Sequence, residues 1–517
     1  MAFQDNIKQT SVQLDQIKTY TPAVKVGDVI LPAGIGGDFI PGSSQGSSTA
    51  FYKCTSVDTS NATWVGRKAL LNDGVYSFES DSTTGLAYTA VTPIVGEVYS
   101  SDALITASDL YGQPRGSGSI YGVIYDPSSS SPICQRVIKD GDALKQVAAF
   151  PYMPAHNFRR CVMDDLANRH INYYLSPFDS NYKEDGTSSV LTGADGDVMV
   201  EIPICHWSVT EMQDGKILYL ISDQPFTGSE PHPFFYVSPG GATLRKQYVG
   251  AYEACLCTSN GEAIALTQDA SSPASYSSGY KARSLKGTKP WTNASRATAR
   301  VAINANGGYQ VNALFHQYLM LMCMIEGGSL NTQATISPGY TYANWDYTYT
   351  RFSGRCNYGN GTGNLMYDPS QDSNISWQSV NELLKIVQFQ YRGIENPWGH
   401  VWSFVDGIVK EDGGYYMTTD CTAYTDEGYA STYTWKDHSW QTDNNYVRTF
   451  DYKTFFAKSS GGSETTYLTD YFWYASGSRV VLCGGRLNHG AYGGAGCVTE
   501  LAVLSIVHDT YGFRVSA

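Results

Sequence analysis

The sequence has neither a long apolar run nor an excess of positive charge. Its longest strongly apolar stretch, residues 318–325, is far shorter than the roughly 20 residues that a membrane-spanning helix needs, so we expect no membrane insertion. Charged residues make up 16% of the chain, and 48 acidic residues outnumber 35 basic ones, for a net charge of -13. Because no basic stripe is visible, nucleic acid is excluded as the principal partner.

A secretory leader and a cysteine framework are also missing. The first residues, MAFQDNIK, lack the charged-then-apolar pattern of a signal peptide, so we expect a soluble protein made in a cytoplasm. Of the 11 cysteines, only Cys255 and Cys257 stand close together, and no histidine spacing matches a metal site. This scatter excludes a disulfide framework and a zinc site, and it predicts buried free thiols.

The chain is instead rich in tyrosine and glycine, with 39 and 51 residues respectively. Together with many serines and threonines, this mixture favours strands, turns and exposed aromatic side chains over helix bundles. It is also typical of recognition surfaces, because tyrosine offers a large contact area at a small entropic cost. A chain of 517 residues is long enough for about two to four domains with substantial cores.

Hydrophobic patterning predicts a multidomain protein, in which an N-terminal all-β region precedes a large α+β unit. Residues 1–20 are polar with sparse apolar positions, and we interpret them as an arm for attachment or oligomerisation. Residues 21–146 are predicted to form one or two small all-β domains, and residues 147–517, which show no clean break, one unit. The predicted strands share apolar or alternating sequences bounded by turn residues, and they are 63–65, 75–78, 86–91, 120–125, 132–138 and 195–203.

Three helices are predicted in the second region. Ser295 can cap a helix over 296–306, and Asn312 can cap one over 313–326, each of which stops at a glycine pair. The second helix is apolar on so many sides that it must be nearly enclosed by the rest of the protein. A third is predicted to begin at Ser376, where apolar residues recur at helical spacing.

The stretch 483–497 is typical of a tightly folded surface loop. Two glycine pairs bracket a polar and aromatic tip, and glycine supplies backbone angles that other residues avoid. Loops of this kind on a rigid frame are common binding sites. The candidate contact residues are Arg486, Asn488, His489 and Tyr492, with His508, Asp509 and Thr510 as further candidates on the same face. The alternative is a solvated tip that only closes the fold.

Three stretches together resemble known phage proteins. Residues 391–407 contain Arg-Gly-Ile-Glu-Asn and end in Asp-Gly, a pattern similar to a signature common in phage tail-fibre and receptor-binding proteins. The strand at 198–203, followed by an Asp-Gly hairpin, resembles a segment upstream of that signature. Residues 480–486 and 511–514 resemble the ending of C-type-lectin-like domains of the formylglycine-generating-enzyme type, a fold shared with the variable proteins of diversity-generating retroelements, including phage tropism determinants. The motif residues are Arg392, Glu395, Asn396, Trp398, Trp402, Asp406, Phe513 and Arg514.

This resemblance covers residues 147–517 and implies a C-type-lectin-like domain whose sheet and C-terminal loops form an exposed ligand-binding face. In phage members such a domain lies at the tip of a trimeric tail fibre. The chain departs from both branches of the family. The enzymes carry Arg-Gly-Gly-Ser-Trp where this chain has Cys483-Gly-Gly-Arg-Leu487, and their paired redox cysteines have no close match. Residues 502–507 are apolar, whereas variable proteins carry Asn, Ser and Tyr, which argues against a diversified loop.

Glu395 and Asp406 allow two interpretations. Paired carboxylates can act as acid and base in glycan cleavage. They can also accept backbone hydrogen bonds that hold a turn, and this structural interpretation accounts for the aromatic motif residues as well. We expect no cofactor, although carboxylate and carbonyl oxygens leave a structural calcium ion open as a third interpretation.

The sequence therefore predicts a non-enzymatic phage tail-fibre or receptor-binding protein, located in the virion as a homotrimer. Its partners would be a glycan or protein receptor on the host cell surface and other tail proteins of the virion. Aromatic rings for stacking on sugars and the low charge suit this role. The alternatives are a glycan-degrading tail depolymerase, a formylglycine-generating-type oxidase, and a ligand-binding protein displayed by a bacterium or prophage.

Overall fold

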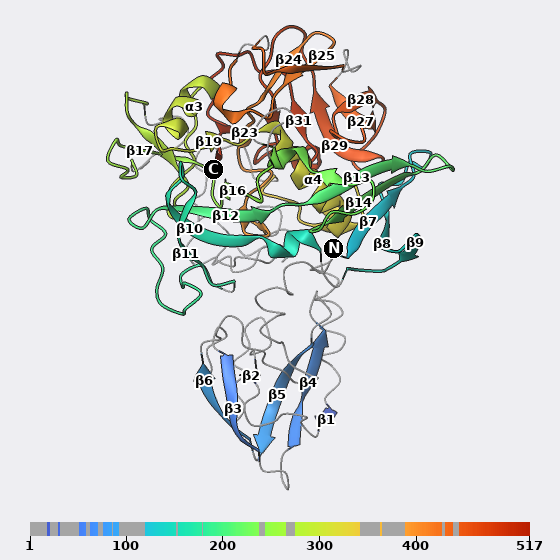
Figure 1. The fold of residues 1–517 in the computed structure, drawn as a ribbon, viewed down its shortest axis with the longest axis vertical. Helices are drawn as coiled ribbons and strands as arrows, with labels where there is room; N and C mark the ends of the chain where they lie inside the picture. Colours follow the sequence, from blue (N-terminus) through green and yellow to red (C-terminus); the bar gives the residue numbers. More distant parts are fainter. Residues whose placement is uncertain are drawn as a thin grey trace. The chain divides into compact units, whose positions relative to one another are not determined.

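Two compact units divide the chain, one made of Met1–Ser117 and Ser176–Ser188, the other of Gly118–Leu175 and Ser189–Ala517 (Figure 1). The computed structural model describes residues 119–150, 153–177, 179–236, 243–264, 275–341, 388–426, 430–437 and 444–517, and the backbone of short strands within 18–91 and at 362–363. Within these residues no helix is long and apolar enough to cross a membrane. The helix predicted from Ser376 and most of the predicted N-terminal arm lie outside them.

The described strands of the smaller unit form two antiparallel sheets, with the orders β1-β4-β5 and β2-β3-β6. Their bounds are β1 (Lys18–Tyr20), β2 (Val29–Ile30), β3 (Phe51–Val57), β4 (Thr63–Leu70), β5 (Tyr76–Thr84) and β6 (Leu86–Val91). Strands thus lie at 63–65, 76–78 and 86–91, where short β-branched and aromatic runs predict them.

The C-terminus of the chain lies inside a six-stranded sheet of the larger unit, with the order β11-β10-β12-β16-β33-β19. The strands are β10 (Arg159–Asp165), β11 (His170–Tyr174), β12 (Asp197–Pro203), β16 (Lys246–Gly250), β19 (Tyr309–Gln310) and β33 (Val515–Ser516). All residues of β12 except Pro203 are buried, as expected for a strand covered on both faces. The final strand β33 pairs with both β16 and β19, so the last residues help to close the core.

A second six-stranded sheet, with the order β15-β13-β14-β7-β8-β9, corrects the predicted domain boundary. Its strands are β7 (Ile120–Tyr125), β8 (Gln135–Asp140), β9 (Ala143–Gln146), β13 (His206–Glu211), β14 (Ile217–Ser222) and β15 (Glu230–Pro231). Residues 120–146, assigned above to the N-terminal region, belong to the larger unit because β7 pairs along its length with β14. Strand patterns alone do not state which strand is the partner.

The two helices predicted from their caps are confirmed as α3 (Arg296–Asn304) and α4 (Ala313–Gly327). Ser295 accepts a hydrogen bond from the backbone of Thr298, and Asn312 accepts one from Phe315 at 2.9 Å. Every residue of α4 except Glu326 is buried, which agrees with its apolar sequence. A short helix, α5 (Thr332–Thr335), follows.

The remaining described strands lie mainly towards the C-terminus. They form a seven-stranded sheet of order β28-β27-β29-β31-β30-β23-β32 and a three-stranded sheet of order β24-β25-β26. Their bounds are β23 (Trp402–Phe404), β24 (Ile408–Glu411), β25 (Gly414–Met417), β26 (Thr434–Asp437), β27 (Asn445–Phe450), β28 (Ala457–Ser460), β29 (Leu468–Trp473), β30 (Leu482–Cys483), β31 (Val498–Thr499) and β32 (Tyr511–Gly512).

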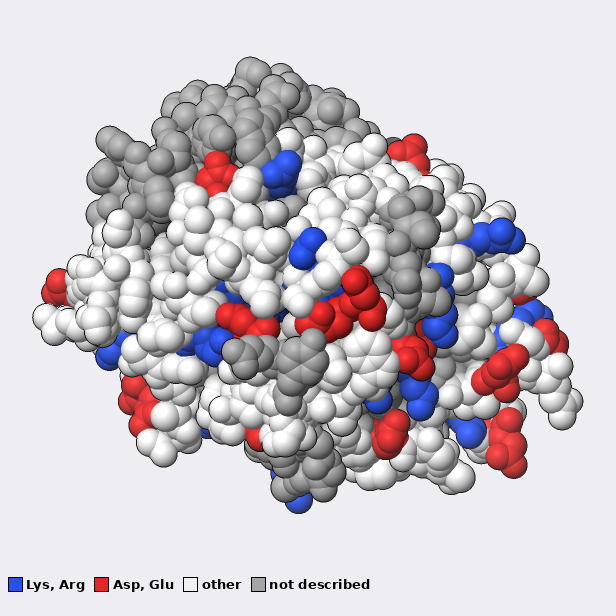
Figure 2. Space-filling model, turned by 90° about the horizontal axis from the view of Figure 1, so that it is seen from above, with Lys and Arg blue, Asp and Glu red and all other residues white. Residues whose placement is uncertain are grey.

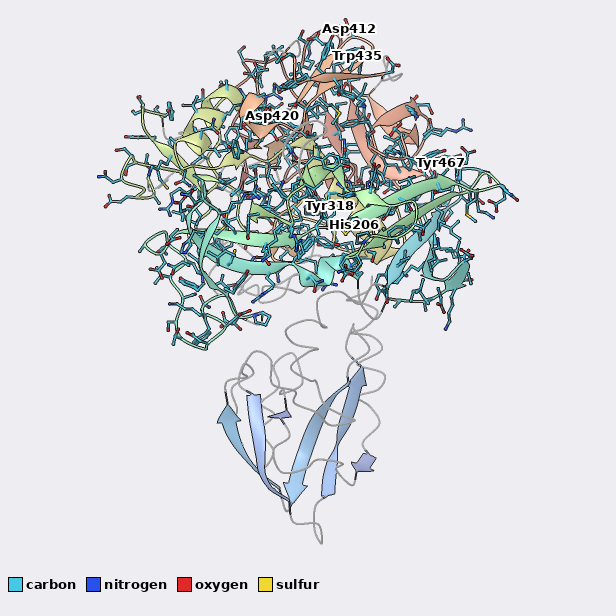
Figure 3. All side chains as sticks on the ribbon, viewed as in Figure 1. His206, Tyr318, Asp412, Asp420, Trp435 and Tyr467 are labelled. Atoms are coloured by element: carbon cyan, nitrogen blue, oxygen red, sulfur yellow. The ribbon has the colours of Figure 1, made fainter. Side chains whose placement is uncertain are left out.

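Short elements complete the larger unit, and they are β17 (Cys255–Cys257), β18 (Lys281–Arg283), β20 (Thr362–Gly363), β21 (Gln390–Tyr391), β22 (Ile394–Glu395), η1 (Pro154–Asn157), η2 (Pro233–Phe235), η5 (Cys421–Ala423) and η6 (Gly490–Tyr492). The described chain is therefore mainly β-sheet with few helices. Figure 3 shows Tyr318 of α4 within the unit, whereas Asp412 and Trp435 lie at its outer edge beside β24 and β25.

The motif at residues 391–407 and the C-terminal motif at residues 511–514 meet in the core, where Arg514 makes hydrogen bonds to the first motif. This buried side chain donates to the carbonyl oxygens of Gly250 at 2.8 Å, Glu395 at 2.6 Å and Asn396 at 3.2 Å. Asn396 can present its carbonyl because its backbone is left-handed, with φ of 45°. Phe513 next to Arg514 stacks on Phe404 with a centroid distance of 5.3 Å. The ending of the chain thus holds the turn of the upstream motif in place.

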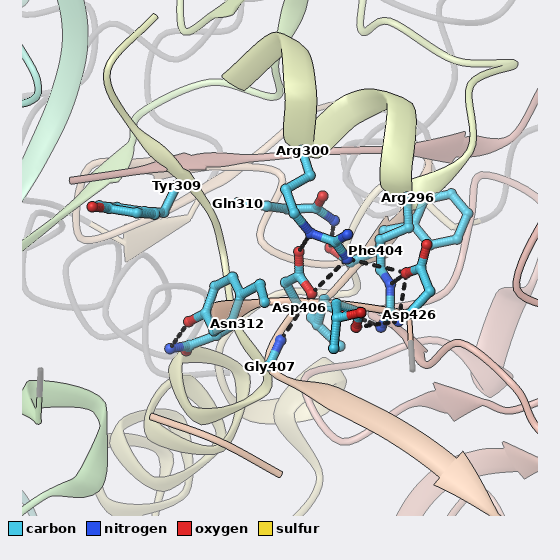
Figure 4. Close-up of polar contacts among 12 residues, drawn as sticks. Arg296, Arg300, Tyr309, Gln310, Asn312, Phe404, Asp406, Gly407 and Asp426 are labelled. Atoms are coloured by element: carbon cyan, nitrogen blue, oxygen red, sulfur yellow. Dashed lines mark hydrogen bonds and ion pairs between the residues drawn. The ribbon is translucent and has the colours of Figure 1, made fainter. Parts of the chain in front are cut away.

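Asp406 is held by helix α3 and is fully buried (Figure 4). Its carboxylate accepts two hydrogen bonds from Arg300, at 2.6 and 3.0 Å, and one from the backbone of Gly407 at 3.0 Å. Arg300 and the neighbouring Arg296 also pair with Asp426. A charge buried without these partners would cost several kcal/mol, on the order of 3–5. Asp406 therefore fastens α3 to the turn after β23.

Candidate functional site

The loop between β30 and β31 has the glycine-dependent form that the sequence predicts. Gly484 and Gly485 have φ of 90° and 78°, and Gly494 has φ of 144°, a region that residues with a Cβ rarely adopt. The backbone N–H of Gly484 donates to Cys497 at 2.9 Å and closes the loop. A Cβ on Gly494 would lie 2.2 Å from the Asp470 carboxylate, so only glycine fits there.

The predicted contact residues in this loop differ in exposure. Asn488 is exposed and Tyr492 is 44% exposed, while Arg486 and His489 are partly buried. Tyr492 lies on η6, the short turn that follows the tip of the loop. The loop therefore presents its side chains to solvent in part and to the sheet in part.

Tyr492 packs against aromatic residues of two strands, and together they form what we call the aromatic surface: Tyr446 of β27, Tyr471 and Trp473 of β29, and Tyr492. Tyr492 lies 4.6 Å from Tyr471, 5.7 Å from Tyr446 and 6.0 Å from Trp473 between ring centroids. Tyr446, Tyr471 and Trp473 are partly exposed, whereas Phe472 between the latter two is buried. Side chains alternate across a strand, so Tyr471 and Trp473 share the outer face.

From the sequence alone, the aromatic run at residues 471–474 before the loop is interpreted as part of a buried frame, and the structure corrects this interpretation. Tyr471 and Trp473 are partly exposed, and only Phe472 is fully enclosed. The sequence did carry a sign of this exposure, because Tyr471 and Trp473, whose rings bear a polar group, alternate with the apolar Phe472. Tyr446 lies 25 residues before Tyr471 in the chain. Nothing in the sequence indicated that Tyr446 belongs to this surface, because strand pairing alone brings it beside Tyr471.

His489 joins the aromatic surface to the polar part of the site. Its ring lies 4.9 Å from that of Trp473 and 5.1 Å from that of Trp402. Burial, with the nearby Arg486 cation as a smaller cause, lowers the pKa of His489 to about 3. The imidazole is therefore neutral, and its Nε2 accepts a hydrogen bond from Arg486 at 3.1 Å. The ring proton then lies on Nδ1, which has no partner within the described part of the chain.

Residues 508–510 lie in the loop between β31 and β32 and come within hydrogen-bonding distance of Arg486. Arg486 donates from Nη1 to the Thr510 hydroxyl at 3.2 Å, and that hydroxyl lies 2.9 Å from Nδ1 of His508. Asp509 lies 2.7 Å from the same nitrogen, but the backbone N–H of Thr510 also donates to it, so we assign Nδ1 as an acceptor. Thr510 is buried and connects the loops rather than facing solvent. The structure thus brings Arg486, His489, His508 and Thr510 together.

The residues considered for catalysis lie elsewhere. Glu395 is 2% exposed and Asp406 is fully buried, so neither faces the aromatic surface as a free carboxylate. Of the motif residues, Trp402 alone among those described here touches the site, through its ring contacts with Trp473 and His489. Arg392 pairs with Glu326, and Trp398 donates to the Ser337 carbonyl in the core.

The cysteines are poor candidates for metal binding or redox chemistry. All nine cysteines of the described residues are free thiols, and all but Cys421 are buried, which confirms the predicted buried thiols for eight of these nine. Burial raises the pKa of Cys483 and Cys497 well above the usual range, so both stay protonated and weakly nucleophilic. Among the described residues, no group of three or more His, Cys, Asp or Glu side chains could hold a metal ion.

Comparisons with known proteins give little further guidance. Neither protein-family models nor curated proteins match this sequence. Solved structures similar to the chain include the U1 and P3c variants of the Major Tropism Determinant, each 12% identical to it. Each comparison covers 90% of this chain and 94% of the other, with TM-scores of 0.23 and 0.24. At such TM-scores the likeness carries no weight for fold or function.

Proposed function

We propose that this protein is a phage tail-fibre or receptor-binding protein that recognises a molecule on the host cell surface. The observation that carries the proposal is the aromatic surface, which the C-terminal loop and two strands build beside Arg486 and Thr510. Partly exposed aromatic rings next to hydrogen-bonding groups are typical of recognition sites. The resemblance of residues 391–407 to a signature of phage receptor-binding proteins supports the same conclusion.

The ring geometry favours an open contact surface over an enclosed cavity. Neighbouring centroids are 4.6–6.0 Å apart, the spacing of rings in direct contact, so no guest fits between them. Neighbouring ring planes are inclined by 51–89°, so a partner such as the apolar face of a sugar, or a protein side chain, can stack on an individual ring and contact the edges of its neighbours. Figure 2 shows one face of the molecule, on which small clusters of charged residues lie between wide uncharged areas.

Tyr492→Ala tests the proposal, because the Tyr492 side chain is 44% exposed and its removal leaves little of the core unfilled. We expect at least a tenfold loss of binding to host cells, measured with labelled protein, with the unfolding midpoint nearly unchanged. Tyr182→Ala is the matched control, since Tyr182 is also 44% exposed and belongs to the other compact unit. Equal binding by wild type and Tyr492→Ala would place the receptor site elsewhere.

The proposal extends to fold and assembly. We propose that the larger unit adopts a C-type-lectin-like fold with the C-terminal loops as its binding face, and that three chains assemble as a homotrimer. The N-terminal region would then attach the fibre to other tail proteins of the virion. Light scattering on the full chain should report three times the monomer mass of 56.6 kDa, and a monomer at micromolar concentration would contradict the trimer.

We further propose that recognition occurs without catalysis. The burial of Glu395 and Asp406 and the raised pKa of the Cys483 and Cys497 thiols support this proposal. Shortened chains after incubation with host capsule or lipopolysaccharide would instead identify a depolymerase. Unchanged receptor binding by a Cys483→Ser, Cys497→Ser double variant would remove the oxidase alternative. A bacterial or prophage display protein would bind its ligand but would be absent from purified virions.

A further inference from the structure

Asp470 is a buried acid directly beneath the loop that carries Tyr492. It lies on β29 next to Tyr471, with its side chain turned inward and no exposed surface. Oδ2 accepts a hydrogen bond from the backbone N–H of Gly496 at 2.7 Å. Oδ1 has no hydrogen-bond partner among the described residues. A buried carboxyl with only one partner is uncommon and calls for an explanation.

The returning arm of the loop is shaped around this carboxyl. Gly494 approaches so closely that a Cβ would lie 2.2 Å from Oδ1, and a Cβ on Gly496 would lie 3.1 Å from Oδ2. Between them, the backbone N–H of Ala495 donates to the Thr332 hydroxyl at 3.1 Å. The arm is therefore anchored at two neighbouring points, and one of these anchors can ionise. Residues 486–492, which carry the predicted contacts, lie immediately before it.

We propose that Asp470 is a protonation-dependent latch for the C-terminal loop: the neutral carboxyl holds the loop against the sheet, and loss of its proton releases the loop and takes Tyr492 away from the aromatic surface. This regulation rests on the proposed binding function only for its effect on the receptor. The latch itself is a property of the loop.

The surroundings of Asp470 explain why the neutral form is the one that fits. The titratable groups that act on it or respond to it are the thiols of Cys323 on α4 and Cys497 in the loop, both buried and protonated. No basic side chain among the described residues pairs with Asp470, so a negative charge there has no counter-ion. Water can solvate the charge only if the glycine-rich arm moves away, because Gly494 and Gly496 cover it.

Burial raises the pKa of Asp470 to about 8 in the closed state, whereas an exposed aspartate titrates near pH ~4. The closed loop therefore binds the proton more tightly than the open loop. Its advantage is complete below about pH 4 and is lost progressively as the pH rises towards 8. Opening of the loop should increase up to about tenfold per pH unit in this window and become constant above it.

Hydrogen exchange between pH 5 and pH 8 tests the latch on the full chain, with protection factors for residues 484–497 as the readout. In the wild type we expect these factors to fall up to about tenfold per pH unit, and in Asp470→Asn to stay constant. Glu500→Gln is the matched control, because burial also raises the pKa of Glu500 to about 8 but its carboxyl does not contact this arm. That variant should keep the pH dependence of the loop.

A constant protection factor in the wild type, or the same slope in Asp470→Asn, would overturn the proposal. If Asp470→Asn does not fold, difference infrared spectroscopy on Glu500→Gln decides, since a protonated carboxyl must then titrate near pH 8. Absence of that signal would also overturn the latch.

Host-cell binding separates the two proposals: a loop that opens with pH while binding stays constant contradicts the receptor site but not the latch. Binding that depends on Tyr492 with no pH-dependent exchange contradicts the latch alone.

Discussion

At the scale of single residues, the site depends on side chains whose neighbours set their charge. His489 is neutral because it is buried between two tryptophans and lies next to a cation. Its Nε2 can therefore accept from Arg486 and hold the guanidinium towards Thr510. A protonated His489 would repel Arg486 and break this contact.

Removing the Arg486 charge should raise the pKa of His489. In Arg486→Gln we expect that pKa to rise from about 3 but to remain below that of a free imidazole, because burial is the larger cause of the shift. NMR titration of the imidazole resonances measures it. His316 is the internal control, since burial alone lowers its pKa to about 3. An unchanged pKa of His489 would mean that Arg486 does not act on it.

Gly494→Ala should destabilise the fold by about 2–4 kcal/mol, the sum of backbone strain and overpacking. The added Cβ would overlap the Asp470 carboxyl group, and φ at this position is 144°. Gly228→Ala separates the two effects, because Gly228 has φ of 80° with no atom within 4 Å of the added Cβ, and should cost only about 1 kcal/mol. Urea unfolding measures both, and equal losses would refute the close contact.

At the scale of elements, the motif at residues 391–407 and the C-terminal motif at residues 511–514 form one hydrogen-bonded unit. The turn at Glu395–Asn396 directs carbonyl oxygens at Arg514, and strand β33, which lies between β16 and β19, follows Arg514 directly. The frame under the binding loop therefore depends on residues more than 100 positions apart in the sequence, as the separation of Glu395 from Arg514 illustrates.

Arg514→Lys should lower the free energy of unfolding by about 2–5 kcal/mol, because one ammonium group cannot reach carbonyls on both sides and leaves buried acceptors unsatisfied. Chemical denaturation followed by tryptophan fluorescence measures the loss. Arg448→Lys is the control, since Arg448 is exposed, and it should change stability by no more than about 0.5 kcal/mol. A comparable small effect for Arg514→Lys would remove its proposed role in holding the motif.

At the scale of the whole molecule, the low charge of the chain coexists with two buried acids, Asp470 and Glu500, that form no ion pair within the described residues. Burial raises the pKa of both Asp470 and Glu500 to about 8, well above their values of about 4 in an unfolded chain. Each group therefore binds its proton more tightly when folded, so its contribution to stability is largest in acid and declines as pH rises.

We expect the free energy of unfolding to decrease between pH 5 and pH 8 by up to about 1.4 kcal/mol per pH unit for each of these acids. An Asp470→Asn, Glu500→Gln double variant should lose most of this slope. Urea titrations at four pH values compare the two proteins. A wild type that becomes more stable over this range relative to the double variant would contradict the burial of neutral carboxyls.

Local chemistry made part of this architecture predictable from the sequence. The caps Ser295 and Asn312 set the starts of α3 and α4, because each side chain accepts a hydrogen bond within its own helix. The glycine pairs likewise identified a loop whose backbone angles only glycine adopts readily. These features depend on residues a few positions apart, and such information is complete in the sequence.

The tertiary structure alone decided which distant residues meet. Pairing of β7 with β14 placed residues 120–146 in the larger unit, and pairing of β27 with β29 brought Tyr446 to Tyr471. An alternating strand sequence states which face is apolar but not which strand lies beside it. The loop of 483–497 was therefore identifiable from its glycines, whereas the aromatic surface beside it and the buried acid beneath it followed from the order of strands in the sheet.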